Sequence, residues 1–235
     1  MAHEGIKGVR VAIGNEVFRH GVVAPVVECV VDGLRLTADL ERGQKTGLFL
    51  DQRENARAMG RYARDARVLD GHCYVGLWSC HAAAAGARHV RGVDTSSPAI
   101  ELSMQNARLN DLGGVCTFEA ADILEVLKRG GEYDLVILDP PAFAKTRSQG
   151  HKALGLYQAL NRAAMEVLSP GGVLVTSSCS HFVSREAFLE SLKRAAANAH
   201  RGAWFLDVRG PAADHPTLTA MPETAYLTCA TLRML

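Results

Sequence analysis

Short apolar runs alternate with amphipathic segments from about Arg67 to the end of the chain. Five runs have the length of buried strands: RVLDG, HVRGVD, VCTFEA, YDLVILD and GVLVTSS. Segments of helical length and period, such as SPAIELSMQNARLN and ALGLYQALNRAAMEVL, lie between them. This alternation predicts an α/β fold with a mostly parallel sheet, helices on both faces and a ligand crevice at the carboxyl ends of the strands. Two later runs, AWFLDV and AYLTCATLRM, predict strands that close one edge.

The N-terminal pattern is different and predicts hairpins. Two β-branched runs within residues 22–40 flank Asp32-Gly33, a dipeptide that tolerates the positive φ angles of a type I′ turn. A weaker hairpin is predicted around Gly14-Asn15, and residues 51–64 predict a helix. We therefore expect an N-terminal β-hairpin extension over residues 1–50 and one α/β domain over residues 51–235. Farther along, Ser97 is the predicted N-cap of a helix whose first residue is Pro98.

Composition narrows the class of protein. A chain of 235 residues with 48% hydrophobic and 22% charged residues has room for one sizeable core and is not disordered. No run approaches the ~18 to 20 apolar residues of a membrane span, and the N-terminus lacks a signal peptide, so we expect a cytoplasmic protein without membrane partners. The six cysteines are dispersed without a C-x-x-C pair, which predicts neither disulfides nor a metal. The net charge of +1 leaves the partner open.

Carboxylates follow three successive predicted strands, at Asp70, Asp94 and Asp122. The loop from Gly71 to Gly76 lacks the central glycine pair of the G-x-G-x-x-G motif, which disfavours NAD. Asp94 is placed where a carboxylate can accept hydrogen bonds from both ribose hydroxyls. Asp122 is placed where it can accept a hydrogen bond from the exocyclic amine of adenine. A cofactor with ribose and adenine but no phosphate, such as S-adenosylmethionine, fits these acids. Alternatively, each acid caps the helix that follows it.

The fourth and fifth strands of the alternation end in residues that can carry chemistry. Asp139 is followed by two prolines and then by Phe143, so a rigid loop presents an acceptor for an exocyclic amine and a ring that can stack on a base. Alternatively, Phe143 belongs to the core. Cys179 comes at the same predicted edge of the sheet, where a thiol can act as a nucleophile if its pKa is lowered.

Cationic residues follow the Pro-Pro loop and predict a surface that binds nucleic acid. They are Lys145, Arg147, His151 and Lys152. Alternatively, they are ordinary charges of a solvated loop.

Several blocks occur in the order found in a known family: GQKTGLFLDQREN, VLDGHCYVG, GVDTSSPAIE, YDLVILDPPAFAK, SSCSH and DHPTLTAMPETAYL. On these blocks, the chain from about Val26 onward resembles the class I S-adenosylmethionine-dependent methyltransferases of large-subunit ribosomal RNA, cytosine-5 type. The resemblance implies a Rossmann-like α/β fold with a mostly parallel seven-stranded sheet, S-adenosylmethionine as the cofactor, and ribosomal RNA as the partner. Members of that family usually carry an RNA-binding PUA domain before the hairpin region, and we expect this chain to lack it. The oligomeric state stays open, with a homodimer among the alternatives.

The resemblance implies roles for individual residues. Cys179 would be the nucleophile, and Asp139 would hold the cytosine. The residues implied to contact the cofactor are Phe49, Gln52, Arg53, Asp70, Tyr74, Gly76, Asp94, Asp122, Asp139 and Pro140. Those expected to contact the substrate are Pro141, Phe143, Lys145, Arg147 and Lys152. Two alternatives stay open: a methyltransferase that acts on adenine or guanine amino groups, in which Cys179 has no role, and an RNA-binding module without catalytic activity.

Overall fold

A seven-stranded sheet forms the centre of the protein. The computed structural model describes residues 8–13, 16–21, 24–41, 43–44, 47–144 and 146–235. The strands of the sheet, in spatial order, are β10 (Ala203–Arg209), β11 (Thr228–Met234), β9 (Leu168–Ser178), β8 (Tyr133–Leu138), β5 (Arg67–Gly71), β6 (His89–Asp94) and β7 (Cys116–Ala120). The five strands from β9 to β7 are parallel, whereas β11 runs antiparallel to both of its neighbours. The predicted α/β fold and its late edge strands are therefore confirmed.

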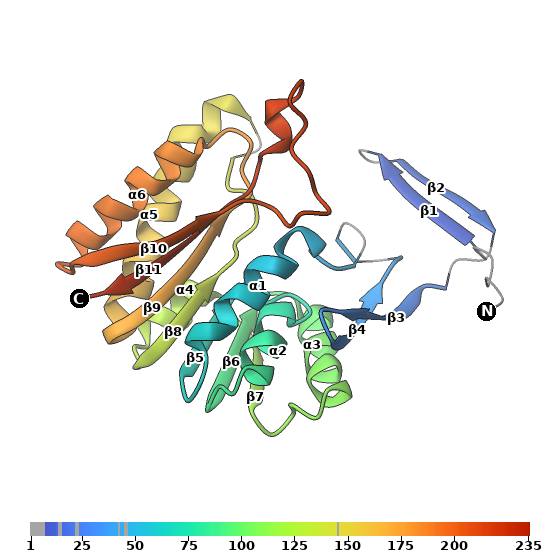
Figure 1. The fold of residues 1–235 in the computed structure, drawn as a ribbon, viewed down its shortest axis with the longest axis horizontal. Coiled ribbons are helices and arrows are strands. Elements are labelled where there is room, and N and C mark those ends of the chain that lie inside the picture. The colour runs from blue at the N-terminus through green and yellow to red at the C-terminus, as the bar shows by residue number, and fades with distance from the viewer. Residues whose placement is uncertain (1–7, 14–15, 22–23, 42, 45–46, 145) are drawn as a thin grey trace.

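Helices cover both faces of the sheet (Figure 1). One face carries α1 (Arg53–Met59), α2 (Leu77–Ala84) and α3 (Ser97–Leu109), and the other carries α4 (Ile123–Lys128), α5 (Gly150–Val167) and α6 (Arg185–Asn198). Four short 3₁₀ segments are η1 (Leu50–Gln52), η2 (Gly60–Tyr62), η3 (Arg147–Gln149) and η4 (Pro222–Thr224). The central strand β8 is buried from Leu135 to Leu138 because both of its faces lie under helices.

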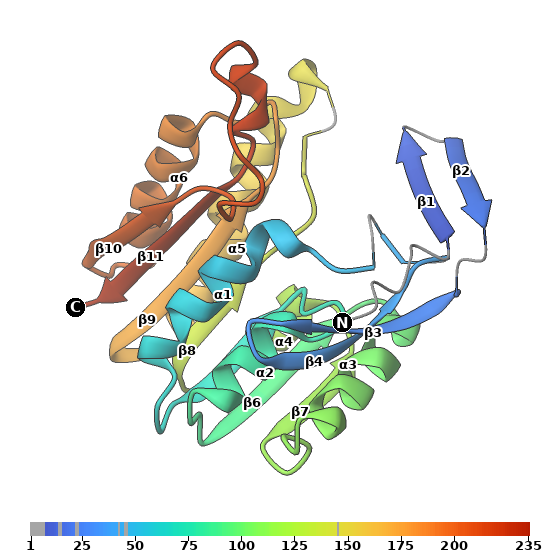
Figure 2. The same ribbon diagram turned by 45° about the vertical axis from the view of Figure 1, so that its right-hand side comes forward.

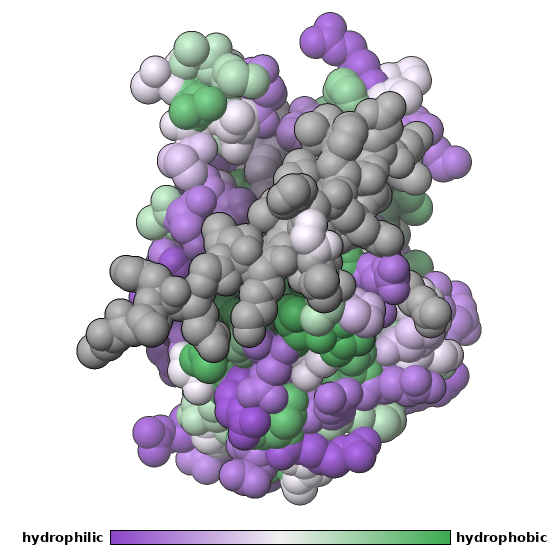
Figure 3. All heavy atoms as spheres, turned by 90° about the vertical axis from the view of Figure 1, so that its right-hand side faces the viewer, coloured by the Kyte–Doolittle hydropathy of each residue, from purple (hydrophilic) through white to green (hydrophobic). Residues whose placement is uncertain are grey.

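Two hairpins precede the sheet: β1 (Gly8–Ile13) with β2 (Glu16–Gly21), and β3 (Val26–Val31) with β4 (Leu34–Asp39). Both predicted hairpins are present, although Gly14 and Asn15 lie outside the described residues. The turn of the second hairpin has φ angles of 47° at Asp32 and 88° at Gly33, the left-handed pair that its sequence predicts. Seen from the side of these hairpins, apolar atoms are interspersed with hydrophilic ones (Figure 3).

The second hairpin is docked onto α3 by two asparagines one helical turn apart. Asn106 Oδ1 accepts from the Thr37 amide at 2.7 Å, and Asn110 Oδ1 accepts from the Arg35 amide at 2.8 Å. Asn110 Nδ2 also donates to the Arg35 carbonyl, so these side chains satisfy the open edge of β4 as a neighbouring strand would. Leu34 and Leu36 of β4 are buried in the same core as β5 and α2.

The start of α3 differs from the prediction by one residue. Ser96, and not Ser97, is the N-cap, and its side chain accepts from the Ala99 amide. Ser96 is preferred because its extended backbone conformation lets its hydroxyl reach the amide three residues later.

No described helix combines the length and apolar character that crossing a membrane requires.

Candidate active site

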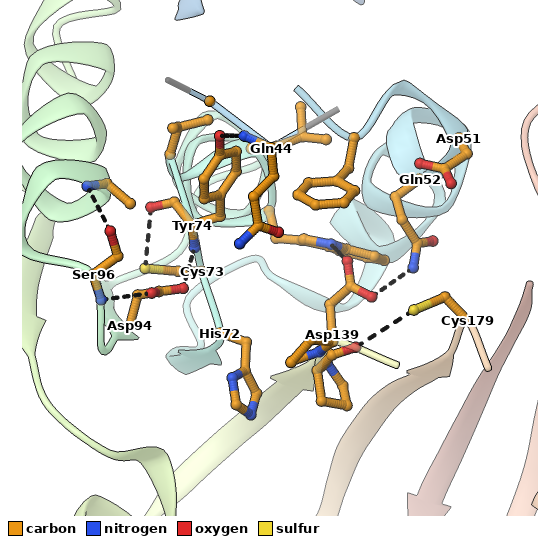
Figure 4. A pocket seen from close by; sticks show the side chains of 18 of the residues that line it. Gln44, Asp51, Gln52, His72, Cys73, Tyr74, Asp94, Ser96, Asp139 and Cys179 are labelled. Atoms are coloured by element: carbon orange, nitrogen blue, oxygen red, sulfur yellow. Dashed lines mark hydrogen bonds between the residues drawn. The ribbon is translucent and has the colours of Figure 1, made fainter. Parts of the chain in front are cut away.

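A cavity of about 800 Å³ opens at the carboxyl ends of β5, β6, β8 and β9. Figure 4 shows side chains that line it, drawn from the segment before α1, the loop after β5 and the ends of the other strands. Seven of the residues predicted to contact cofactor or substrate line this cavity: Phe49, Gln52, Tyr74, Asp94, Asp139, Pro140 and Pro141. The predicted nucleophile Cys179 also lines it.

The loop after β5 turns sharply under the cavity. His72, Tyr74 and Gly76 have φ angles of 61°, 48° and 85°, and Gly76 is the N-cap of α2. A Cβ atom at Gly76 would lie 3.1 Å from the Cβ of Ser103, so a side chain there would be both strained and crowded. Gly76 itself, predicted to contact the cofactor, is not among the lining residues, although its neighbours Val75 and Leu77 are.

Asp94 is fixed at the tip of β6 by two backbone amides. Its Oδ2 accepts from the Tyr74 amide and its Oδ1 from the Ser96 amide, both at 2.9 Å. Each carboxylate oxygen keeps a further lone pair, which matches an acceptor for two neighbouring hydroxyls. The ring of Tyr74 stands edge-on to Phe49 at a centroid distance of 5.3 Å, and its hydroxyl accepts from the Gln44 amide. These contacts close one end of the cavity.

Asp139 is held at the tip of β8 by two side chains from other elements. Gln52 Nε2 donates to its Oδ1 at 2.8 Å, and Trp78 Nε1 donates to its Oδ2 at 3.1 Å. Gln52 and Trp78 are almost completely buried. The Asp139 carboxylate is thus an acceptor of fixed orientation at the centre of the cavity wall (Figure 4).

A chain of hydrogen bonds behind Gln52 decides which way its amide faces. Asn55 Nδ2 donates to Gln52 Oε1 at 2.8 Å and to the Gly210 carbonyl at 3.0 Å. Arg209 Nε donates to Asn55 Oδ1 at 3.1 Å, so Asn55 can present only its nitrogen to Gln52. The amide nitrogen of Gln52 must then face Asp139. Nothing in the isolated sequence pattern pointed to Asn55 or Arg209, because the contact joins residues more than 150 positions apart.

Cys179 follows β9 and lies on the same side of the cavity as Gln52 (Figure 4). Its Sγ is 3.8 Å from the carbonyl oxygen of Pro140, which places the thiol beside the Pro-Pro loop (Figure 4). Two of the buried cysteines are in different surroundings: burial raises the pKa of Cys116 and of Cys229 to about 12. Thiols of that kind stay protonated and unreactive near neutral pH.

Three further side chains complete the wall near Cys179, and none was predicted from the sequence as a site residue. Tyr226 donates its hydroxyl proton to the buried carboxylate of Asp51. The ring of His181 lies against that of Tyr226 at a centroid distance of 5.4 Å. Burial is the largest cause of a raised pKa at Tyr226, and the bond to Asp51 raises it further. These residues lie within the motif blocks of the sequence, but the contacts among them become visible only in the folded structure.

Some predicted site residues lie outside the cavity. Arg53 Nη1 donates to Asp32 Oδ1 and its Nε to Asp214 Oδ2, both at 2.9 Å, so it joins the second hairpin to the C-terminal loop. Asp122 caps α4 by accepting from the Leu124 and Glu125 amides. Asp70 is completely buried beneath the loop and accepts from Ser79 Oγ at 2.6 Å.

The predicted substrate residues beyond Pro141 are also outside the cavity lining. The ring of Phe143 packs against that of Tyr157 at a centroid distance of 4.7 Å. Arg147 and Lys152 are exposed at the start of α5, whereas Lys145 lies outside the described residues. No group of acidic, His or Cys side chains in the described part of the chain has the arrangement of a metal site.

The charge of the cavity selects the kind of cofactor it can hold. Its described lining contains four aspartates, Asp39, Asp51, Asp94 and Asp139, and neither Lys nor Arg. Such a lining repels the phosphates of a dinucleotide and attracts a cation. S-adenosylmethionine carries a sulfonium and an ammonium group beside its ribose hydroxyls, so the residues present fit it.

The fold and the cavity define a class I methyltransferase architecture. The family model of S-adenosylmethionine-dependent methyltransferases matches residues 18–213. The chain belongs to the S-adenosylmethionine-dependent methyltransferase family, and S-adenosylmethionine is its cofactor. Two solved structures share the fold. One, a putative methyltransferase complexed with SAH, has a TM-score of 0.80 and 24% identity, and the match covers 91% of this chain and 57% of that one. The other, a putative methyltransferase from Streptococcus mutans, has a TM-score of 0.81 and 23% identity, and the match covers 92% of this chain and 58% of that one.

Curated relatives carry the name Ribosomal RNA large subunit methyltransferase I. The protein from Tolumonas auensis is 40% identical over 201 residues, covering 83% of this chain and 51% of that protein. The protein from Aeromonas hydrophila is 38% identical over 208 residues, covering 86% and 52%. The resemblance noted from the motif blocks is thereby confirmed. The chain spans about half the length of these relatives.

The buried carboxyl of Asp70 gives a testable pH dependence. Burial raises its pKa from 3.8 to about 7, against the lowering effect of the Ser79 hydrogen bond, and the charge of Asp139 raises it further. Because the folded state holds this proton more tightly than the unfolded state, stability should fall as the pH rises from about 4 to about 7. Asp70→Asn should flatten this decline in urea unfolding of the cofactor-free protein. Asp65→Asn, at an exposed turn, is the control; an unchanged slope in Asp70→Asn would refute the assignment.

Asp94 lines the cavity whereas Asp122 caps α4, and this difference gives a second test. Asp94→Ala should weaken S-adenosylmethionine binding by roughly tenfold or more in calorimetric titration, because a carboxylate acceptor in the cavity wall is lost. Asp122→Ala should lower the melting temperature through loss of the α4 cap and leave the cofactor affinity within about threefold. Equal losses of affinity in the two variants would contradict the placement of the cofactor.

Proposed function

We propose that the chain methylates carbon 5 of a cytosine in large-subunit ribosomal RNA through a covalent adduct with Cys179. The observation that carries this proposal is that Cys179 and Asp139 line one cavity from the tips of adjacent parallel strands, with the Cys179 sulfur 3.8 Å from the Pro140 carbonyl. A nucleophile and an oriented acceptor thus flank a space that a base can enter. The names of the curated relatives support the choice of RNA.

Carbon 5 of cytosine is a weak nucleophile, so the ring must be activated before it can be methylated. The Cys179 thiolate forms a bond to carbon 6, and the displaced ring electron pair moves to the ring nitrogen at position 3. The thiol proton, released when the thiolate forms, is taken up at that nitrogen, so the adduct is neutral. Carbon 5 is then the electron-rich carbon of an enamine.

Asp139 orients the base during this addition. Its carboxylate is held by Gln52 and Trp78 and is directed into the cavity, where it accepts a hydrogen bond from the exocyclic amine of cytosine. It also shares the proton at the neighbouring ring nitrogen, which stabilises the charge that develops there. Because the donors to Asp139 are buried side chains from two other elements, little reorganisation is needed when the base enters.

The cofactor would lie between the loop after β5 and the tip of β6, with Asp94 at its ribose and Tyr74 and Phe49 over its methionine portion. Its sulfonium, when bound, supplies the electrophilic methyl group that carbon 5 takes up. Proton loss from carbon 5 then breaks the carbon–sulfur bond, the ring nitrogen gives up its proton, and Cys179 is regenerated as the thiolate. Ribosomal RNA as the partner and the cytoplasm as the location belong to the same proposal.

Replacement of Cys179 tests the chemistry. Cys179→Ala should lower methyl transfer to in vitro transcribed large-subunit ribosomal RNA by ~10³-fold or more, because the activating bond to carbon 6 cannot form. The measurement is mass spectrometry of nucleosides after incubation with isotopically labelled methyl donor, and the wild-type product should be 5-methylcytidine.

The control is Cys29→Ala, at a half-buried thiol on β3, which should keep the wild-type rate. A label on an adenine or guanine amino group, with most of the rate retained in Cys179→Ala, would instead identify an amino-group methyltransferase that uses the Asp-Pro-Pro loop.

A further inference from the structure

Phe182 is a large apolar side chain on the surface, three residues after Cys179. It is 45% exposed, in the loop that joins β9 to α6. The loop is anchored before Phe182 by Ser180, whose Oγ contacts Tyr157 Oη at 3.0 Å, and after it by the buried Val183. An exposed aromatic ring on an anchored loop is available to stack on a base.

The backbone of this loop packs directly against the start of α5. A Cβ atom built on Gly150 would lie 2.9 Å from the carbonyl oxygen of Phe182, so only glycine allows this approach. Arg147, three residues before Gly150, and Lys152, two residues after it, are exposed at the same end of α5. Figures 1 and 2 show the yellow start of α5 at the edge of the sheet where the orange loop after β9 emerges.

The charges of Arg147 and Lys152 are not neutralised by an ion pair with any described residue. Arg53, Arg67 and Arg91 each form ion pairs, whereas no carboxylate among the described residues lies within ion-pair distance of Arg147 or Lys152. The cavity beside them is lined by aspartates and excludes phosphate. We call Arg147, Lys152 and Phe182 the cavity rim: a polyanion would be held there by the two cations, while only its uncharged base entered the acidic cavity.

We propose that Phe182, Arg147 and Lys152 bind the single-stranded RNA segment next to the target base. The ring of Phe182 stacks on the neighbouring base, and the two cations contact phosphates. This arrangement keeps the backbone outside the acidic cavity as one unpaired base turns toward Cys179. The identity of the polymer rests on the proposed function, whereas the surface rests on the exposure, packing and charge of these residues.

The test is the binding of a fluorescein-labelled RNA of about 12 nucleotides, with one cytidine among uridines, measured by fluorescence anisotropy on the cofactor-free protein. Phe182→Ala should weaken binding about tenfold, and Phe182→Trp should restore it, because any flat ring stacks on a base. The double variant Arg147→Ala with Lys152→Ala should also weaken binding. It should reduce the slope of log K against log salt by about 1.4, since each phosphate contact to a single strand contributes about 0.7.

Matched controls lie away from the rim. Trp204 is 59% exposed on the edge strand β10, and Arg88 is exposed before β6 at the opposite ends of the strands. Trp204→Ala and Arg88→Ala should bind the RNA like wild type. Phe182→Ala should leave the salt slope and the melting temperature unchanged. Binding by Phe182→Ala within about twofold of wild type, or an equal loss in Trp204→Ala, would overturn the proposal.

The two proposals fail in distinguishable ways, because RNA binding is measured without methyl transfer. If the rim variants weaken binding but no 5-methylcytidine forms, the surface is supported and the cytosine assignment is wrong. If 5-methylcytidine forms and the rim variants bind RNA normally, the proposed function stands and the surface is wrong.

Discussion

The hydrogen bonds that hold the Asp139 carboxylate join segments from three parts of the chain. Gln52 comes from the segment before α1, Trp78 from α2, and Asp139 from the tip of β8. All three meet at the carboxyl edge of a parallel sheet, where the fold leaves space for a ligand. Because Asn55 and Arg209 in turn fix the amide of Gln52, the orientation of one carboxylate depends on contacts that reach to β10. The cavity wall is thus determined by the whole fold.

Charge divides this edge of the molecule into two regions. Aspartates line the cavity, which suits a cationic cofactor, and cations without acidic partners among the described residues lie outside it at the start of α5. A phosphate backbone would be repelled from the first region and attracted to the second. Under the proposed function, this division would let one small domain bind a sulfonium and an RNA segment within a short distance without the two sites competing.

The sequence predicted the elements well because each has a strong local signal. The strand β8 is an unbroken apolar run, and the turn at Asp32-Gly33 has the left-handed conformation that this dipeptide favours. The position of Cys179 at a predicted strand end and the resemblance of the block around Gln52 to a family motif both pointed to residues that line the cavity. Arg53 was expected in the same site, but it forms ion pairs with Asp32 and Asp214, which lie 21 and 161 positions away in the sequence. The pairing of Tyr226 with Asp51 is equally remote in sequence, so no local pattern could reveal it.

The bond between the Cys179 sulfur and carbon 6 of a cytosine is tested most directly with a large-subunit ribosomal RNA transcript that contains 5-fluorocytidine. Release of the thiolate requires loss of the proton on carbon 5. Fluorine replaces that proton, so the carbon–sulfur bond should persist after methyl transfer. Intact-mass analysis and gel electrophoresis should then show a protein–RNA adduct, and the modified peptide should contain Cys179. Methylation of the unmodified RNA without any adduct to the fluorinated RNA, or an adduct that survives in Cys179→Ala, would contradict the role of this thiol.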